Sequence, residues 1–270
     1  MEKKSRRAFL KETSAAALGL SVGAPAVLAT ACSGEAGAQD HGETTSERQW
    51  AMVIDMERAQ STAVREACRE ACNRAHNVPR IPDPEEEIHW IWTEEYQHVF
   101  PDQVHARTPE SQLEFPVLVL CNHCTNPPCV RVCPTQATWK REEDGIVMMD
   151  MHRCIGCRYC MAACPYGSRS FNWRDPREFI ETDANGDFLS EYPTRTRGVV
   201  EKCNFCAELL RDGEVPACVE AANQTPGGQG ALVFGDLSDP DSEVSRALQT
   251  ERTISRRNAL GTGPNVFYIV

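Results

Sequence analysis

The feature that most constrains this chain is a run of four cysteines and a proline at residues 154–165. It reads Cys154-Ile-Gly-Cys157-Arg-Tyr-Cys160-Met-Ala-Ala-Cys164-Pro165, a C-x2-C-x2-C-x3-C-P pattern. In bacterial ferredoxins, three cysteines at this spacing hold one 4Fe–4S cluster and the fourth binds another cluster. A disulfide or zinc knot is the alternative, and four thiolates followed by proline disfavour it. The motif therefore predicts a partner set of cysteines elsewhere in the chain.

The number and distribution of cysteines favour metal binding over disulfide cross-linking. The chain has 14 cysteines in 270 residues, and 10 of them lie between Cys121 and Cys206. Disulfide-rich secreted proteins are usually shorter, with cysteines spread more evenly. The net charge of −11 also argues against nucleic acid as a partner.

A second cysteine set, at residues 121–134, is complete. It reads Cys121-Asn-His-Cys124-Thr-Asn-Pro-Pro-Cys129-Val-Arg-Val-Cys133-Pro134. His123 lies between two ligands, but the cysteines already complete the set, so we expect it to have a loop role. Exchange of the fourth cysteine between the two sets predicts two clusters. Cluster A takes Cys121, Cys124, Cys129 and Cys164, and cluster B takes Cys154, Cys157, Cys160 and Cys133.

The cysteine set that precedes this pair is damaged. Only Cys68 and Cys72 remain, and Thr62 and Arg65 stand at the two earlier ligand positions. Neither threonine nor arginine is a plausible iron ligand here. The stretch 56–74 is rich in Ala, Glu and Arg, so we expect it to be helical.

The set that follows the pair is also incomplete, because Ala222 occupies the position of its last cysteine. Exchange between the first and last sets gives a cluster C with four ligands: Cys203, Cys206, Cys218 and Cys72. A fourth cluster would need the positions that have been lost, with only Cys68 remaining. We therefore predict three 4Fe–4S clusters and a Cys68 that binds no iron.

Several secondary-structure elements can be predicted between and beyond these sets. Residues 50–55 and 231–234 have the pattern of strands, and residues 138–150 predict a hairpin around an Asp-Gly turn. Ser238-Asp-Pro240 predicts a capped helix start. The apolar tail at 266–270 predicts a strand that pairs with a partner protein.

The N-terminus predicts export. Ser5-Arg6-Arg7-Ala8-Phe9-Leu10-Lys11 is similar to the twin-arginine signal, and a mildly apolar run follows it. We predict that residues 1–38 form a signal peptide and linker, and that the protein is periplasmic and reaches the membrane through its partners. Two A-x-A cleavage sites end at Ala31 and Ala38, and lipidation of Cys32 stays open as an alternative.

The cysteine sets at 121–129 and 154–167 resemble those of the four-cluster ferredoxin subunits of the molybdopterin oxidoreductase (DMSO reductase) superfamily. The similarity runs from about residue 50 to residue 237. Within that family, the export signal, the damaged first set and the missing last cysteine are most similar to DsrO. DsrO is the periplasmic iron–sulfur subunit of the sulfite-reduction-associated complex DsrMKJOP. The stretches 192–202 and 261–268 also look like that subunit.

The resemblance implies an α+β fold of duplicated bacterial ferredoxin-like domains with long loops and insertions. One half would combine 50–120 with 200–237 and lack one cluster, and 121–199 would hold two clusters, with 238–270 as a C-terminal extension. It also implies partners: an NrfD/DsrP-like quinone-interacting membrane subunit, a multihaem cytochrome c and other Dsr-type redox subunits.

The expected function is electron transfer, without substrate turnover by this chain alone. The sequence has no nucleotide-binding glycine pattern after a strand and no flavin signature. Three clusters would relay electrons between the quinone-interacting subunit and other redox subunits of a membrane-bound respiratory complex of sulfur or sulfite metabolism. Polysulfide, tetrathionate and nitrite reductase complexes are alternatives. Two alternatives belong to other functional classes. One is a structural zinc or disulfide protein without a redox role, and the other is an enzyme that uses Cys68 as a free reactive thiol.

Overall fold

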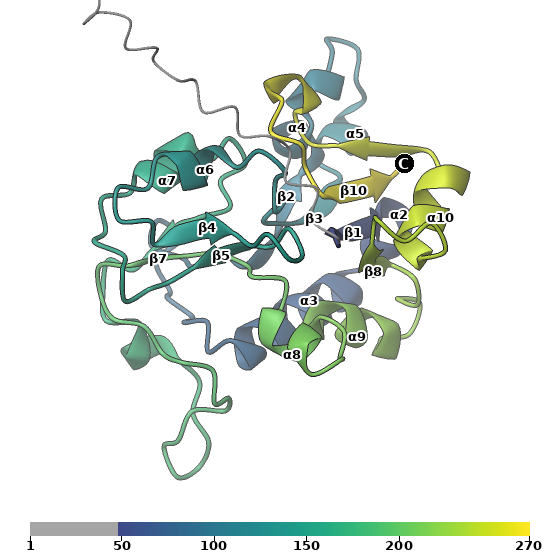
Figure 1. Cartoon of the computed structure of the whole chain (residues 1–270). Coiled ribbons are helices and arrows are strands. Elements are labelled where there is room, and N and C mark those ends of the chain that lie inside the picture. The colour runs from purple at the N-terminus through teal and green to yellow at the C-terminus, as the bar shows by residue number, and fades with distance from the viewer. Residues whose placement is uncertain (1–47) are drawn as a thin grey trace, which may run out of the picture. The chain divides into compact units, whose positions relative to one another are not determined.

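The computed structural model of the chain describes residues 48–270 (Figure 1). The twin-arginine segment, its two cleavage sites and Cys32 lie outside the described residues. Helices and strands are mixed along residues 48–270, which agrees with the predicted α+β class. In this part of the chain, no helix is both long enough and apolar enough to cross a bilayer.

A four-stranded sheet joins the two ends of the described chain. Its strands lie in the order β8 (Leu232–Asp236), β1 (Trp50–Asp55), β10 (Val266–Ile269) and β9 (Thr253–Ser255). β1 pairs in parallel with β10 and antiparallel with β8, and β9 runs antiparallel to β10. The strands predicted at 50–55 and 231–234 are therefore present, and they lie side by side (Figure 1).

The C-terminal strand corrects one prediction. We expected residues 266–270 to pair with a partner protein, but β10 lies between β1 and β9 of this chain. The physical reason is that Val266 and Tyr268 alternate into the main core, where both are fully buried. The Tyr268 ring packs edge-on against Phe100, with 5.1 Å between ring centroids. Since β10 is paired on both sides, it offers no open edge to another protein.

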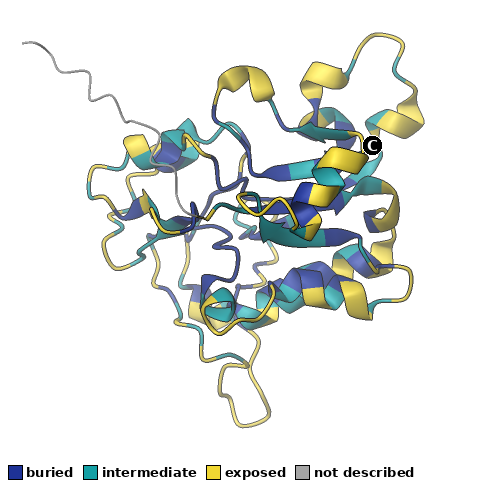
Figure 2. Cartoon of the chain, turned by 45° about the vertical axis from the view of Figure 1, so that its right-hand side comes forward, coloured by how far each residue is buried: buried dark blue, intermediate teal, exposed yellow. Residues whose placement is uncertain are grey.

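β1 is apolar along its length because both faces of the sheet are covered. Met52 and Ile54 belong to the main core, while Ala51 and Val53 pack with helix α10 (Glu243–Thr250). All four side chains are fully buried, so the strand shows no alternation of apolar and polar residues. In Figure 2, buried residues run through the strands and the helices turn their exposed residues outward.

α10 begins later than predicted. We expected a helix start at Ser238-Asp-Pro240, but this segment is a turn in which the Ser238 N–H donates to Asp236 Oδ1 at 2.9 Å. The cap is Ser242, whose Oγ accepts from the Ser245 N–H at 3.1 Å. The helix follows the apolar spacing that begins at Val244, because that spacing places its side chains on the sheet.

The stretch 56–74 is helical, as predicted, although the helix is interrupted. α2 (Met56–Ala59) and α3 (Thr62–Ala75) are separated by two residues. α3 packs against α9 (Ala217–Gln224), the helix of the last cysteine set. Val64, Cys68 and Ala222 are buried together in the main core. Apolar side chains therefore occupy the space between the two damaged cysteine sets.

The rest of the described chain consists of short elements, and most of the remaining cysteines lie in the loops between them. The predicted hairpin at 138–150 is present as β4 (Thr138–Lys140) and β5 (Val147–Met149). Two other strand pairs are β2 (Ile91–Glu95) with β3 (Pro116–Leu120), and β6 (Ser170–Phe171) with β7 (Val200–Glu201). The short helices are α4 (Tyr96–Val99), α5 (Glu110–Leu113), α6 (Pro128–Arg131), α7 (Tyr159–Ala163), α8 (Ala207–Arg211), and the 3-10 turns η1 (Pro101–Gln103), η2 (Pro176–Phe179) and η3 (Asn258–Leu260).

Candidate metal centres

Four thiols from two separate cysteine sets line one small cavity, which we call site A. The four residues are Cys121, Cys124, Cys129 and Cys164. β3 ends at Leu120 and delivers the first of them, and α6 holds the third. The rest of the wall combines apolar residues such as Pro128 and Val147 with polar ones, among them Arg169. Burial and the three neighbouring thiols raise the pKa of Cys124.

A second small cavity, site B, is lined by Cys133, Cys154, Cys157 and Cys160. α6 and α7 pack together and exchange cysteines between the sites. α6 holds Cys129 of site A and leads to Cys133 of site B, while α7 holds Cys160 of site B and leads to Cys164 of site A. This crossing is the arrangement that the spacing of the two complete sets predicted.

A third group of thiols, site C, joins the two damaged cysteine sets. Its members are Cys72 on α3, Cys218 on α9, and Cys203 and Cys206 in the loop before α8. All four are buried. Burial raises the pKa of Cys72, and the thiols of the other three raise it further, so they lie within electrostatic range of one another.

The three sites are arranged in the order B, A, C. Cys129 of site A and Cys160 of site B belong to one buried hydrophobic cluster, and Cys121 of site A and Cys203 of site C belong to another. Site B lies nearest the surface, because Cys157 is exposed and its neighbours Ile155 and Tyr159 are 66% and 62% exposed. Site A is therefore the middle of a row whose outer end is site B.

In each of the three sites, the first C-x2-C loop has a left-handed residue before its second cysteine. These residues are His123, Gly156 and Phe205, with φ of 42°, 69° and 57°. Such a conformation turns neighbouring N–H groups inward and forms a concavity that binds anions. In site C, the Phe205 N–H donates to Cys203 Sγ at 3.4 Å. The sequence hints at this feature only at Gly156, since glycine adopts positive φ without strain.

His123 has a loop role, as expected. Its Nδ1 accepts from the Val147 N–H at 3.1 Å, and its ring stacks on Phe205 with 3.8 Å between centroids. Burial lowers the pKa of His123 far below its usual value, which leaves the ring neutral. Because His123 belongs to the loop of site A and Phe205 to that of site C, the stacked rings join the two loops. This contact could not be read from the sequence.

Cys68 lies beside site C but contacts it differently from the other thiols. Its Sγ–H donates to the backbone oxygen of Cys218 at 3.3 Å, and the side chain is fully buried. Burial raises the pKa of the Cys68 thiol to about 12. Thr62 is exposed at the start of α3, and Arg65 donates to its hydroxyl. Among the described residues, Thr62, Arg65 and Ala222 stand at the other three predicted ligand positions, and none of them adds a thiol beside Cys68.

The donor set is suited to iron–sulfur clusters. None of the thirteen cysteines in the described part of the chain forms a disulfide. Burial raises the pKa of Cys203 to about 12, so thiolates in these sites need a nearby positive centre to persist. Four thiolates around a small cavity, as at sites A and B, match the ligation of a 4Fe–4S cluster, and zinc can also take four thiolates.

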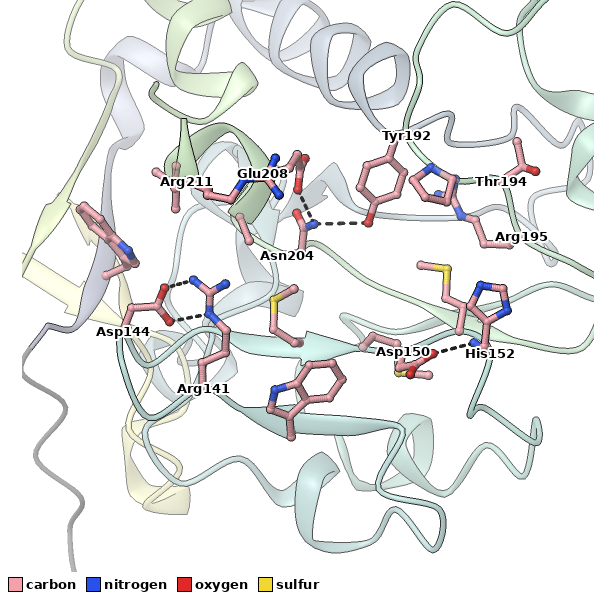
Figure 3. Close-up of a pocket in the computed structure, with 18 of the residues that line it drawn as sticks. Arg141, Asp144, Asp150, His152, Tyr192, Thr194, Arg195, Asn204, Glu208 and Arg211 are labelled. Atoms are coloured by element: carbon pink, nitrogen blue, oxygen red, sulfur yellow. Dashed lines mark hydrogen bonds and ion pairs between the residues drawn. The ribbon is translucent and has the colours of Figure 1, made fainter. Parts of the chain in front are cut away.

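A larger, open groove lies over the β4–β5 hairpin and the loop at 192–196 (Figure 3). It has a volume of about 740 Å³, and no cysteine is among the described residues that line it. The amide of Asn204 donates to Glu208 Oε2 at 2.9 Å and to the Tyr192 hydroxyl at 3.3 Å, which fixes one wall. The groove is thus separate from the three thiol sites.

Comparison with known proteins agrees with the donor set. A family model for the 4Fe–4S dicluster domain matches residues 115–178, the segment that contains the eight cysteines of sites A and B. The chain is 41% identical to the Hdr-like menaquinol oxidoreductase iron-sulfur subunit 1 of Archaeoglobus fulgidus over 282 residues, which cover 98% of this chain and 97% of that protein.

Two further relatives have related names. The menaquinone reductase iron-sulfur cluster-binding subunit of Nitratidesulfovibrio vulgaris is 35% identical over 82% of this chain and 88% of its own length. The B subunit of the polysulfide reductase of Wolinella succinogenes is 39% identical over 55% of this chain and 64% of its own length. Since the similarity to the first relative extends over almost the whole chain, it includes site C and the sheet as well as sites A and B. The chain therefore belongs to the family of 4Fe–4S iron–sulfur subunits of oxidoreductases, and it is an electron-transfer subunit rather than a catalytic one.

Proposed function

We propose that this chain relays electrons through three 4Fe–4S clusters, held at sites B, A and C. The observation that carries this proposal is the row of three four-thiol sites, in which site A lies between the other two. Each bound cluster would accept and release one electron at a time. The protein supplies the thiolates, keeps water from sites A and C by burial, and leaves site B close to the surface for exchange with a partner.

The partners that we propose are a quinone-interacting membrane subunit of NrfD/DsrP type, a multihaem cytochrome c and other Dsr-type redox subunits. Support comes from relatives named as a menaquinol oxidoreductase subunit and a menaquinone reductase subunit. The DsrO-like features of the sequence favour a respiratory complex of sulfur or sulfite metabolism. A polysulfide or tetrathionate reductase complex is the second candidate, favoured by relatives with those names. Purification of the native complex and identification of its subunits distinguishes the two.

We also propose that the described chain consists of two ferredoxin-like halves, 50–120 with 200–237 and 121–199. The loops of sites A and C support this duplication. Cys121-Asn-His-Cys124 and Cys203-Asn-Phe-Cys206 share the asparagine, and each has a left-handed third residue. An experimental structure in which the two loops do not superpose would contradict the duplication.

We predict that the protein is exported by the twin-arginine route. Replacing both Arg6 and Arg7 with lysine should leave the full-length precursor in the cytoplasm, because the export machinery reads the arginine pair. Cell fractionation and immunoblotting measure the distribution, with the unaltered chain as the control. An unchanged periplasmic fraction in the double variant would show that the protein takes another route. Mass spectrometry of the mature N-terminus then decides between the two cleavage sites and a lipid on Cys32.

Iron content tests the number of clusters. We expect about twelve irons and about twelve labile sulfides per chain, because each 4Fe–4S cluster contributes four of each. Cys68→Ala should keep all of them, whereas Cys72→Ala, one turn later on α3, should lose the cluster of site C. The two variants form a matched pair, since both remove a buried thiol from the same helix face. Colorimetric iron and sulfide analysis of the anaerobically purified chain measures the result.

Other results of the iron analysis would contradict the three-cluster proposal or the electron-transfer proposal. About sixteen irons, or a loss of iron in Cys68→Ala, would show that a fourth cluster is present. Zinc in place of iron would overturn the electron-transfer proposal and favour a structural zinc protein. Labelling of Cys68 by iodoacetamide in the native protein would favour a reactive thiol, which burial opposes.

A further inference from the structure

Arg169 is a buried cation in the wall between sites A and B. It lines the cavity of site A. Its guanidinium donates to Thr138 Oγ1 at 2.9 Å and contacts Met149 Sδ at 3.7 Å. Thr138 and Met149 both line the cavity of site B. The positive charge of Arg169 therefore lies against both sites at once.

Lys202 is a buried cation in the wall between sites A and C. Its Nζ donates to the backbone oxygen of Cys203 at 2.6 Å and to that of Val147. Cys203 belongs to site C, and Val147 lines the cavity of site A. Only 2% of Lys202 is exposed, so water does not solvate the ammonium group. The two cations thus occupy the two boundaries within the row of sites.

Neither cation forms an ion pair with a carboxylate of residues 48–270. Burial lowers the pKa of Lys202, and nearby Arg169 also lowers it, while the thiols of Cys121, Cys203 and Cys129 act in the opposite direction. For Arg169, burial lowers the pKa, but the thiols of Cys129, Cys160 and Cys121 outweigh burial and raise it. A buried charge without a compensating partner costs several kcal/mol. The anionic partners that these cations face are therefore the thiolates of two neighbouring sites.

A third buried cation, Arg195, is compensated differently from Arg169 and Lys202. Arg195 is fully buried and forms an ion pair with Glu201, which is also fully buried. At this position the buried arginine is compensated by a carboxylate of the same chain. At Arg169 and Lys202 the chain supplies thiols instead, and a cluster with four thiolates would carry net negative charge there.

We propose that Arg169 and Lys202 are fixed charges that raise the reduction potentials of the clusters that they face. Arg169 acts on clusters A and B, and Lys202 acts on clusters A and C. The inference rests on the proposed function, because it requires a cluster at each site. Reduction adds one electron to a cluster, and a nearby cation in a medium of low dielectric stabilises that added negative charge. The central cluster is stabilised by both cations, so it retains an electron more readily than either cation alone would allow.

The test uses charge-removing and charge-keeping variants of the cluster-loaded chain. Lys202→Gln removes the charge but keeps N–H donors for the two carbonyls, and Lys202→Arg keeps the charge. Arg169→Gln and Arg169→Lys form the corresponding pair. Redox titration followed by electron paramagnetic resonance gives a midpoint potential for each cluster. Arg211→Gln is the control, because that cation is exposed on α8 and solvent screens its charge.

We expect each charge-removing variant to shift the midpoint potentials of two clusters and to leave the third unchanged. Each Gln variant should lower the reduction equilibrium constant of two clusters at least tenfold, which corresponds to about 59 mV for a one-electron step. The third cluster should not move. One signal should shift in both Gln variants, and this signal belongs to site A. The other shifted signal should differ between the two variants, and the charge-keeping variants should lie close to the unaltered chain.

Other outcomes overturn the inference. Unchanged midpoints, or a uniform shift of all three clusters, would mean that the two side chains act only on packing. Equal shifts in the Gln and charge-keeping variants would mean the same. If Lys202→Gln does not bind iron, Arg169→Gln alone must still move two signals and leave the third unchanged. Absence of clusters from the unaltered chain would instead refute the proposed function, so the two failures can be told apart.

Discussion

Removing site A should stop electron transfer between the two ends of the chain. The double variant Cys121→Ala/Cys129→Ala leaves two thiols at this site, too few to hold a cluster. We expect about eight irons per chain and intact signals from the clusters at sites B and C. Reduction of site C through site B should then fall to the background rate, because among the thiol sites of residues 48–270 site A is the one that adjoins both.

The measurement is rapid mixing with a protein reductant too large to reach the buried thiols of site C, followed by freeze-quench electron paramagnetic resonance. Cys68→Ala is the matched control, since it removes a buried thiol that belongs to none of the three sites. Its rate should equal that of the unaltered chain. Undiminished reduction of site C in the double variant would show that electrons bypass site A, and the linear order of the relay would have to be abandoned.

Replacing Arg195 with methionine should destabilise the protein by about 3–5 kcal/mol. The substitution leaves Glu201 buried without its counter-charge. That carboxylate would keep its hydrogen bonds from Trp90 Nε1 at 2.9 Å and from Asn172 Nδ2 at 2.6 Å, which do not neutralise it. The backbone oxygen of Asn77 would also lose the Arg195 guanidinium, which donates to it at 2.9 Å. The effect is large because both partners are fully buried.

Thermal unfolding of the cluster-loaded chain measures this loss, with a fall in the midpoint of about 2–4 °C for each kcal/mol. Arg177→Met is the control, because Arg177 and its partner Asp175 form an exposed ion pair that water screens. We expect no measurable change in that variant. A small effect of Arg195→Met would mean that Glu201 takes up a proton or that water enters the site. The double variant Arg195→Met/Glu201→Gln should recover part of the lost stability.

The thiols that the sequence assigns to clusters A and B lie together in the structure, and ligand geometry explains why spacing could predict this grouping. Three thiolates at C-x2-C-x2-C can surround one cluster only if the next cysteine turns away from it. α6 and α7 bring about this exchange, so the grouping of thiols in sites A and B follows the predicted one. The Ala, Glu and Arg content of residues 56–74 predicted a helix in place of the damaged first set, and α3 is that helix.

The contacts between the sites could not be predicted, because they join residues far apart in the chain. Nothing in the pattern around His123 indicates that its ring stacks on Phe205, eighty-two positions later. Lys202 precedes a cysteine and resembles any basic residue on a surface, yet it is buried. Burial of a charge depends on the compensating groups around it, and these are set by tertiary packing rather than by local sequence.

The two errors at the C-terminus have related causes. Residues 266–270 are apolar, and an apolar tail is equally compatible with a partner protein or with the sheet of its own chain. The helix start was placed at Ser238 because a proline follows within two residues. The helix instead begins after Ser242, where Val244 reaches the sheet. In both places, packing against β1 decided between local alternatives of similar propensity.

The interior position of β10 has a consequence for how the protein matures in the cell. β10 lies between β1 and β9, yet in the chain it follows every cysteine that the structure describes. Because a chain is synthesised from its N-terminal end, β1 has no β10 beside it until residues 266–269 have left the ribosome. The thiols of sites A, B and C are therefore synthesised before the sheet beside them can be completed.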